Sequence, residues 1–304
     1  MGFVSYAQNF EDVILWRALG GAGPGFWIDV GAADPVIDSV TLAFSRRGWR
    51  GINVEPRDNG QARLRAARPR DINLAVALGA APGRLTFHEY DDGGLSTLDA
   101  DIAARHRAAD RPAREREVEV TTLAAICAAH ADEVIHFLKI DVEGAERAVL
   151  EGADFVRFRP WVMLIEATLP QSQVDASAHW EPLVLAAGYR FAWFDGLNRF
   201  YIAAEKWDDL SAHFGLPPNL FDGFRLAGPA ELAAAEARFV VPGAVSSEQT
   251  SGRSSVPRRL VGGLARRIRG FLSAEVRDEL ASLRQEVVQL RDAVEALAAR
   301  DERR

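Results

Sequence analysis

Runs of β-branched and aromatic residues alternate with stretches of helical periodicity over most of the chain. Five of these runs have the length of buried strands, and they span residues 26–30, 51–55, 72–77, 135–141 and 161–167. Strands that alternate with helices are typical of a parallel sheet covered by helices. Two further runs flank Gly196 and Leu197 and predict an antiparallel hairpin, with strands at 189–195 and 198–203. The pattern therefore predicts an α/β fold with a mostly parallel sheet and an antiparallel C-terminal hairpin.

The stretch between the third and fourth predicted strands is too long for a single crossover helix. It contains a strand-like run at 85–89, a Gly-Gly turn, an arginine-rich helical segment and a second strand-like run at 118–121. We interpret it as an insertion over the edge of the sheet, and His88 in its first strand as a surface residue.

The periodicity stops after Phe239. Residues 242–252 are rich in small polar side chains, which is typical of a flexible linker. We therefore expect a folded domain at 1–240, a linker at 241–257 and a separate C-terminal segment at 258–304.

The C-terminal segment carries an apolar seam with alternating spacings of four and three residues. Its members are Val276, Leu280, Leu283, Val287, Leu290, Val294 and Leu297. This heptad pattern on an otherwise polar helix predicts a coiled coil, so we expect a homo-oligomer joined through residues 275–300. The alternative, a helix that folds back on its own domain, usually has a wider apolar face. Residues 261–272 place arginines between apolar positions, a pattern compatible with contact with an anionic membrane surface. Their glycines weaken a helix, and the alternative is a solvated connector.

The composition and charge of the chain argue against several classes of function. A net charge of -7 argues against general nucleic-acid binding, which favours a strongly basic face. Cys127 is the chain's only cysteine, which excludes an intramolecular disulfide and a thiolate metal cluster, and its apolar neighbours indicate a buried structural thiol.

The beginning of the sequence lacks the features of an export signal, and no run has the roughly 18 apolar residues of a membrane-spanning helix. We expect a cytoplasmic protein, with peripheral contact at the inner face of the membrane through its C-terminal segment.

The first candidate site is the end of the first predicted strand, where Asp29 precedes Gly31 and Ala32. A glycine at the carboxyl end of such a strand allows a ligand to approach the backbone. Glu55 lies at the end of the next strand, before Pro56, where an acidic residue can accept both hydroxyls of a ribose. A nicotinamide dehydrogenase is the main alternative, but the second and third glycines of its G-x-G-x-x-G motif are absent. Because S-adenosylmethionine (SAM) has a sulfonium cation and no phosphate, one glycine with nearby carboxylates fits SAM better.

The second candidate site follows the fourth predicted strand. Asp141 and Glu143 are two residues apart, and strand alternation would place both side chains on one face. Glu146 follows at a predicted helix start, where a carboxylate favours the helix dipole. A sulfonium is a suitable positive partner for such a concentration of acids.

Several segments together resemble the FkbM family of methyltransferases. They are residues 5–12 (SYAQNFED), 28–32 (IDVGA), 53–56 (NVEP), 94–98 (GLSTL) and 138–146 (LKIDVEGAE). The resemblance runs from about residue 5 to residue 203. It implies a class I, Rossmann-like methyltransferase fold, SAM as cofactor, and O-methylation of a hydroxyl on a polyketide or on a sugar of a bacterial surface polysaccharide. It also implies that glycosyltransferases are frequent partners, and one departure from the family is Asp34-Pro35, where many relatives carry asparagine in this loop.

The same resemblance implies roles for the N-terminal residues and for the end of the fifth strand. Gln8, Asn9, Glu11 and Asp12 would close over the cofactor, and Glu166 would face the acceptor. A sugar hydroxyl is a poor nucleophile near neutral pH, so a base within hydrogen-bond reach should assist. The candidates are Glu143, Asp141 and Glu166, and Glu143 is favoured if Asp141 binds the methionine amino group.

We expect no metal, because no histidine-rich ligand spacing is present and carboxylates alone would suit only a hard cation. A second function hypothesis is an inactive methyltransferase-fold scaffold that organises a polysaccharide assembly complex through its coiled coil. The intact acidic positions favour the enzyme.

Overall fold

The computed structural model describes residues 2–90, 94–132, 134–170 and 172–237. These residues belong to one compact unit. The predicted linker, membrane-contact segment and coiled coil lie outside the described residues, so they stay predictions.

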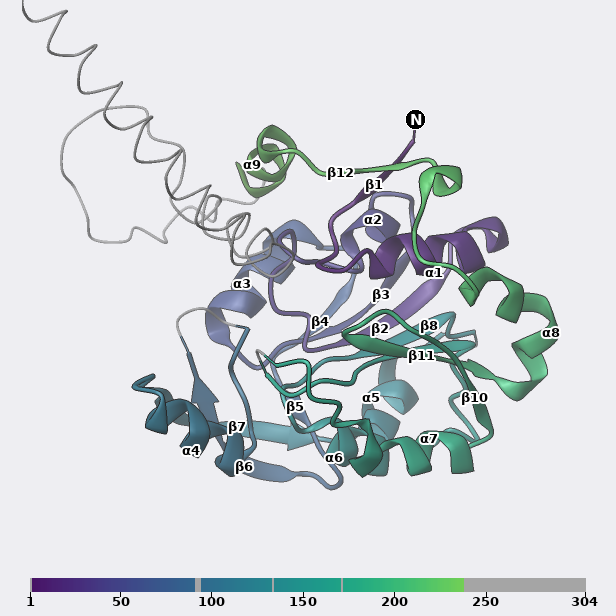
Figure 1. The fold of residues 1–304 in the computed structure, drawn as a ribbon. Coiled ribbons are helices and arrows are strands. Elements are labelled where there is room, and N and C mark those ends of the chain that lie inside the picture. The colour runs from purple at the N-terminus through teal and green to yellow at the C-terminus, as the bar shows by residue number, and fades with distance from the viewer. Residues whose placement is uncertain (1, 91–93, 133, 171, 238–304) are drawn as a thin grey trace, which may run out of the picture. The chain divides into compact units, whose positions relative to one another are not determined.

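Seven strands of the described chain form the main sheet, in the order β10-β11-β9-β8-β2-β3-β4 (Figure 1). Their bounds are β2 (Phe26–Val30), β3 (Arg50–Val54), β4 (Ile72–Leu74), β8 (Phe137–Ile140), β9 (Val162–Glu166), β10 (Tyr189–Phe194) and β11 (Asn198–Ala203). Strands β9, β8, β2, β3 and β4 run parallel to one another, whereas β11 pairs antiparallel with both β9 and β10. The predicted mostly parallel sheet with its C-terminal hairpin is confirmed.

Helices cover both faces of this sheet (Figure 1). They are α1 (Glu11–Leu19), α2 (Leu42–Ser45), α3 (Asp58–Ala67), α5 (Leu123–His130), α6 (Glu146–Glu151), α7 (Glu181–Ala186) and α8 (Trp207–Leu210). On one face Ile28 and Leu138 share a core with residues of α5, α6 and α7. On the other face Trp27 and Phe137 share a core with residues of α1, α2 and α8. Because successive strand residues point to opposite faces, neighbouring positions enter different cores, and central strands buried on both sides read as continuous apolar runs.

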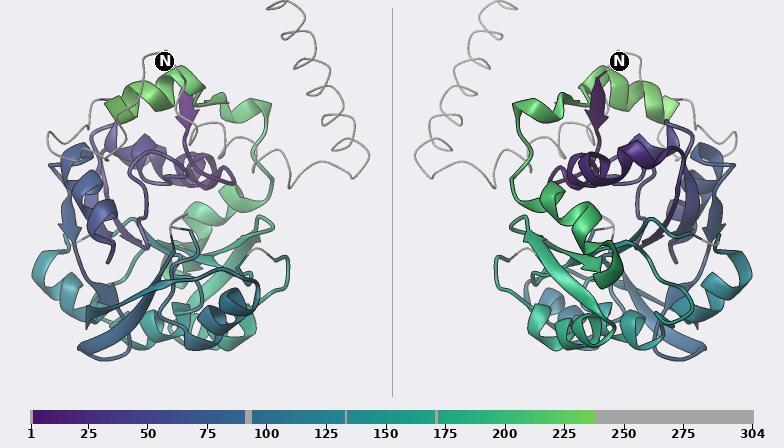
Figure 2. Two further views of the ribbon diagram at one scale, coloured as in Figure 1. Left: turned by 90° about the vertical axis from the view of Figure 1, so that its left-hand side faces the viewer. Right: turned by 90° about the vertical axis from the view of Figure 1, so that its right-hand side faces the viewer.

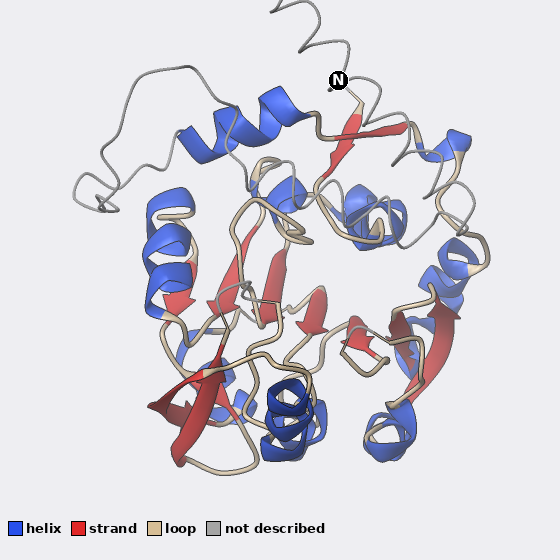
Figure 3. Ribbon diagram, turned by 60° about the vertical axis from the view of Figure 1, so that its left-hand side comes forward, coloured by secondary structure: helices blue, strands red, loops and turns tan. Residues whose placement is uncertain are grey.

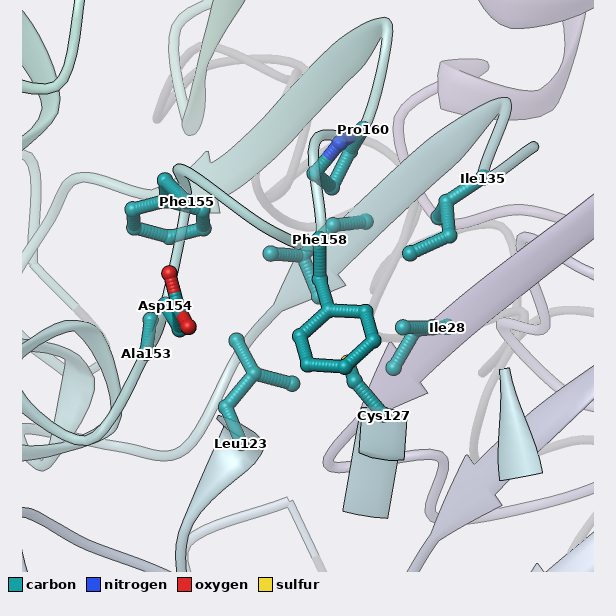
Figure 4. A pocket seen from close by; sticks show the side chains of 10 residues that line it. Ile28, Leu123, Cys127, Ile135, Ala153, Asp154, Phe155, Phe158 and Pro160 are labelled. Atoms are coloured by element: carbon teal, nitrogen blue, oxygen red, sulfur yellow. The ribbon is translucent and has the colours of Figure 1, made fainter. Parts of the chain in front are cut away.

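Cys127 lies on α5 in the first of these cores. Together with Leu123 and Phe158 it lines a cavity of about 10 Å³ (Figure 4), which has room for about one water molecule. Burial, with a smaller contribution from Asp154, raises the pKa of the thiol to about 12. The interpretation of Cys127 as a buried structural thiol is confirmed.

The predicted insertion forms a second sheet, in the order β5-β7-β6. Its elements are β5 (Ala77–Leu78), β6 (Gly83–Glu89), α4 (Ala100–Ala108) and β7 (Arg114–Thr121). The prediction of one strand over 72–77 is wrong, because β3 offers no partner beyond Leu74 and the chain then pairs with β7. The interpretation of His88 as a surface residue is also wrong, because its side chain is buried. Its backbone exchanges two hydrogen bonds with Thr97 in an antiparallel bridge beside β6.

The two ends of the described chain meet. Strand β1 (Phe3–Ser5) pairs in parallel with β12 (Phe224–Leu226), and α9 (Pro229–Ala237) follows beside them (Figure 2). Among the residues described, no helix has both the length and the apolar character needed to cross a bilayer.

Candidate active site

The parallel strands end along one edge of the sheet (Figure 3), and the predicted acidic residues gather there. Carboxylate oxygens of Asp141, Glu143 and Glu166 all lie within 4.8 Å of one another. The structure thus brings the three candidate catalytic residues together. The reason given from the sequence for Asp141 and Glu143 is wrong, however, because β8 ends at Ile140 and both residues belong to the following loop.

Glu143 has a strained backbone that its neighbours hold in place. Its φ is 52°, in the left-handed region that is uncommon for residues with a side chain. The hydroxyl of Thr97 donates to the Glu143 carbonyl at 2.6 Å. Glu146 accepts hydrogen bonds from the backbone N–H groups of Val142 and Gly144, at 3.3 and 3.0 Å. Thr97 belongs to the segment 94–98 that the family resemblance singled out, and its contact gives that segment a physical role.

Glu166 lies in surroundings that disfavour its charged form. Burial raises the pKa of its carboxyl well above the ordinary value, and Asp141, Glu143 and Glu146 raise it further because they are negatively charged. A raised pKa favours the protonated form of a carboxyl, which donates a hydrogen bond instead of accepting a proton, and this argues against Glu166 as the general base.

Lys139 is a site residue that the sequence reasoning missed. Its Nζ lies 3.3 Å from Asp29 Oδ1 and 3.2 Å from Asp141 Oδ2, and it donates to the Gly31 carbonyl at 3.1 Å. Burial alone lowers the pKa of the ammonium, but the two carboxylates outweigh burial and raise it above its ordinary value. A lysine inside an apolar strand, in a chain with only one other lysine, was the signal that could have identified it.

Gly31 allows two strand ends to approach each other closely. Its φ is +81°, and a Cβ at this position would lie 1.8 Å from the carbonyl oxygen of Asp141. The N–H groups of Gly31 and Ala32 both donate to the Val54 carbonyl at 3.0 Å. The sequence suggested that this glycine admits a ligand, whereas in the structure the group that approaches it is the backbone after β8.

Glu55 is buried at the end of β3. The backbone N–H and Nε of Arg57 donate to its Oε1, both at 2.8 Å, and Arg57 Nη2 donates to Oε2 at 3.0 Å. A Cβ on Gly60 would lie 2.7 Å from Glu55 Cγ, so the Glu55 side chain packs directly against the Gly60 backbone. The neighbouring Pro56 accepts a hydrogen bond from Arg116 of the second sheet.

The N-terminal residues form contacts that attach this segment to the rest of the domain. Asp12 is buried and accepts hydrogen bonds from Ser5 Oγ at 2.7 Å and from the Tyr6 N–H at 2.8 Å. Asn198 of the hairpin donates to Glu11 Oε1 at 3.0 Å.

The side chains at positions 8 and 9 differ in their surroundings. Gln8 is exposed, and Asn9 Nδ2 donates to the Asp195 carbonyl at 3.0 Å. Burial, together with the charge of Asp195, raises the pKa of Glu11 to about 8, and burial raises that of Asp12 to about 6. The expectation that Gln8, Asn9, Glu11 and Asp12 close over a cofactor stays a prediction.

The three clustered carboxylates have the donor chemistry and spacing that a hard divalent cation could accept. The expectation of a metal-free site stays a prediction. A cavity of about 270 Å³ lies away from these carboxylates, between α1 and residues 221–222.

A family model described as the methyltransferase FkbM domain matches residues 29–191, just over half of the chain. The chain belongs to the FkbM methyltransferase family. The match begins at Asp29 and includes Glu55, Asp141, Glu143 and Glu166, so it covers the carboxylates at the strand ends. The resemblance stated from the sequence is confirmed, and this FkbM protein is a methyltransferase. No curated protein and no solved structure matches it.

Proposed function

We propose that this FkbM methyltransferase uses SAM and methylates a hydroxyl of a sugar in a surface polysaccharide or a related glycan. The observation that carries the proposal is the group of carboxylates from Asp141, Glu143 and Glu166 beside Gly31, at the point where the central parallel strands end. Ligands of open α/β sheets bind at this edge. Its negative charge suits a cofactor with a sulfonium and an ammonium, and its single glycine does not suit a pyrophosphate.

The acidic residues divide into binding and chemical roles. Glu55 has two carboxylate oxygens at the end of β3 and would accept the ribose hydroxyls once Arg57 moves away. Asp141 would accept the ammonium of the methionine end. When bound, SAM supplies a methyl group that leaves the sulfonium for the acceptor oxygen. Glu143 takes the proton that the acceptor hydroxyl loses.

Glu143 is the best base of the three. The raised pKa of Glu166 favours its protonated form, and Asp141 is paired with Lys139 at 3.2 Å. The loop contacts from Thr97 hold Glu143 in one backbone conformation, which favours catalysis because a base must be positioned within hydrogen-bond reach of the acceptor.

Calorimetry with SAM tests the cofactor. We expect wild-type binding, loss of binding in Glu55→Ala, and unchanged binding in Glu117→Ala, whose side chain is exposed on β7. An absence of binding at millimolar SAM would contradict the enzyme proposal and favour the inactive scaffold. Binding of NAD instead of SAM would favour the dehydrogenase.

Transfer of a labelled methyl group from SAM tests the acceptor and the base. The acceptors are glycans extracted from cells that lack the gene, compared with those from unmodified cells. We expect label in the first extract, and we expect Glu143→Gln to bind SAM normally but to lose at least about a hundredfold in transfer. Label in protein or lipid fractions alone would contradict a glycan acceptor.

We also propose that residues 275–300 join copies of the chain and that residues 261–272 contact an anionic membrane surface. Truncation after Phe239 should then convert an oligomer into a monomer in light scattering, and it should abolish flotation with anionic vesicles. An unchanged mass would contradict the coiled coil, and unchanged flotation would contradict the membrane contact.

A further inference from the structure

We propose that Lys139 is a positioning residue of the methyl-transfer site, which holds the Asp141 carboxylate where the amino-acid end of SAM would bind. The inference rests on the proposed function for the identity of the cofactor. It concerns a residue to which the sequence reasoning assigned no role.

Lys139 connects two strand ends. In the register of the sheet it lies directly beside Asp29, and its long side chain passes the end of β2 to reach both the Gly31 carbonyl and Asp141. Its Nζ donates a hydrogen bond to the Gly31 carbonyl at 3.1 Å and forms ion pairs with Asp141 and Asp29 at 3.2 and 3.3 Å, so protein oxygens surround the ammonium. With its donors engaged by the protein, Lys139 acts on a ligand through Asp141.

The other end of this network is rigidly held inside the domain. Asp29 also accepts a hydrogen bond from the Thr41 hydroxyl at 3.1 Å, and Thr41 in turn accepts one from Arg68. The buried Arg68 is fixed by the Pro35 carbonyl at 2.8 Å and by Ser39. Asp29 therefore serves as an anchor for the ammonium.

The exposed fractions of the side chains show which member of the Asp29–Lys139–Asp141 network a ligand can contact. The side chains of Asp29 and Lys139 are 3% and 10% exposed, whereas that of Asp141 is 35% exposed. A ligand can thus reach Asp141 but not the interior pair. Without the ammonium, the Asp141 side chain would lose its fixed partner and its preferred orientation toward β2.

Calorimetry with two probes separates positioning from a general structural effect. SAM carries the amino-acid end, whereas 5′-methylthioadenosine lacks it and would depend on Glu55. We expect Lys139→Met to weaken SAM at least about tenfold and to change the affinity for 5′-methylthioadenosine by less than about twofold. Lys206→Met is the matched control, because Lys206 lies over the Trp161 ring and outside this network, and it should change neither affinity.

Equal losses for both probes, or no loss for either, would overturn the role of Lys139 while leaving SAM binding by the wild type intact. A wild type that binds neither probe would overturn the proposed function as well. Lys139→Met leaves Asp29 as a buried, unpaired charge, so Asp29→Asn combined with Lys139→Met provides a second variant with the same expected split between probes.

A double-mutant cycle tests whether Lys139 acts through Asp141. We expect Asp141→Asn to weaken SAM about as much as Lys139→Met does, and we expect the double variant to lose little more than either one. Independent, additive losses would overturn the proposed coupling.

Discussion

Replacement of Gly31 by alanine should destabilise the domain far more than the same change at an otherwise similar glycine. The added Cβ would lie 1.8 Å from the Asp141 carbonyl oxygen, a separation at which the backbone must shift because neither atom belongs to a flexible side chain. The ends of β2 and β8 would have to separate by roughly 1 Å or more. That shift would strain the hydrogen bond from the Asp141 N–H to the Val30 carbonyl, which is now 3.0 Å long.

The magnitude follows from three contributions. Left-handed backbone costs a residue with a Cβ about 1–2 kcal/mol. Overpacking against a neighbour that cannot rotate away costs about 1–3 kcal/mol more, and a weakened buried hydrogen bond adds about 1 kcal/mol. We expect Gly31→Ala to lower the free energy of unfolding by about 3–6 kcal/mol, which is a large part of the ~5–15 kcal/mol typical of a whole protein.

Gly48→Ala is the matched control. Gly48 has a similar φ of +88°, but a Cβ there would meet no atom within 4 Å. Gly48→Ala should therefore lower the free energy of unfolding only by the backbone contribution, about 1–2 kcal/mol. Urea unfolding, followed through the fluorescence of buried tryptophans such as Trp27 and Trp49, measures both variants. Equal losses would refute the argument that the close approach of two strand ends requires glycine at position 31.

Three further predictions concern neighbouring groups. Because the folded-state pKa of Glu11, about 8, exceeds its ordinary 4.5, the native state binds this proton more tightly, and stability falls as pH rises from 4.5 through 8. Glu11→Gln should reduce the slope of unfolding free energy between pH 6 and 8 by up to about 1.4 kcal/mol per pH unit, and an unchanged slope would contradict the assignment. Thr97→Val removes the donor to the Glu143 carbonyl, so it should cost about 1–2 kcal/mol and speed hydrogen exchange in the loop after β8; unaltered exchange there would show that the contact is unimportant. Gly60→Ala would push Glu55 out of place and should weaken SAM about tenfold, as measured by calorimetry, and full affinity would mean that Glu55 tolerates the shift.

The sequence alone predicted the strands of the main sheet and the approximate residues at which most of them begin and end. Periodicity is a local property, so the buried runs at 26–30 and 161–167 predicted β2 and β9 closely, and Gly196 predicted the hairpin. Carboxyl ends of parallel strands share one edge, so it also followed that Glu55, Asp141 and Glu166 belong to the same side of the molecule.

Only the tertiary structure decided which residues contact these acids and that the pKa of Glu166 is raised. Lys139 reads as one polar residue in an apolar strand until its neighbour in the sheet is known to be Asp29. Gly31 reads as a ligand-binding glycine until the Asp141 carbonyl is found against it. The raised pKa of Glu166 depends on burial and on the negative charges of a segment about 20 residues earlier in the chain, which reaches Glu166 only after folding. These features depend on distances between residues that are far apart in the chain. A local sequence pattern does not specify such distances.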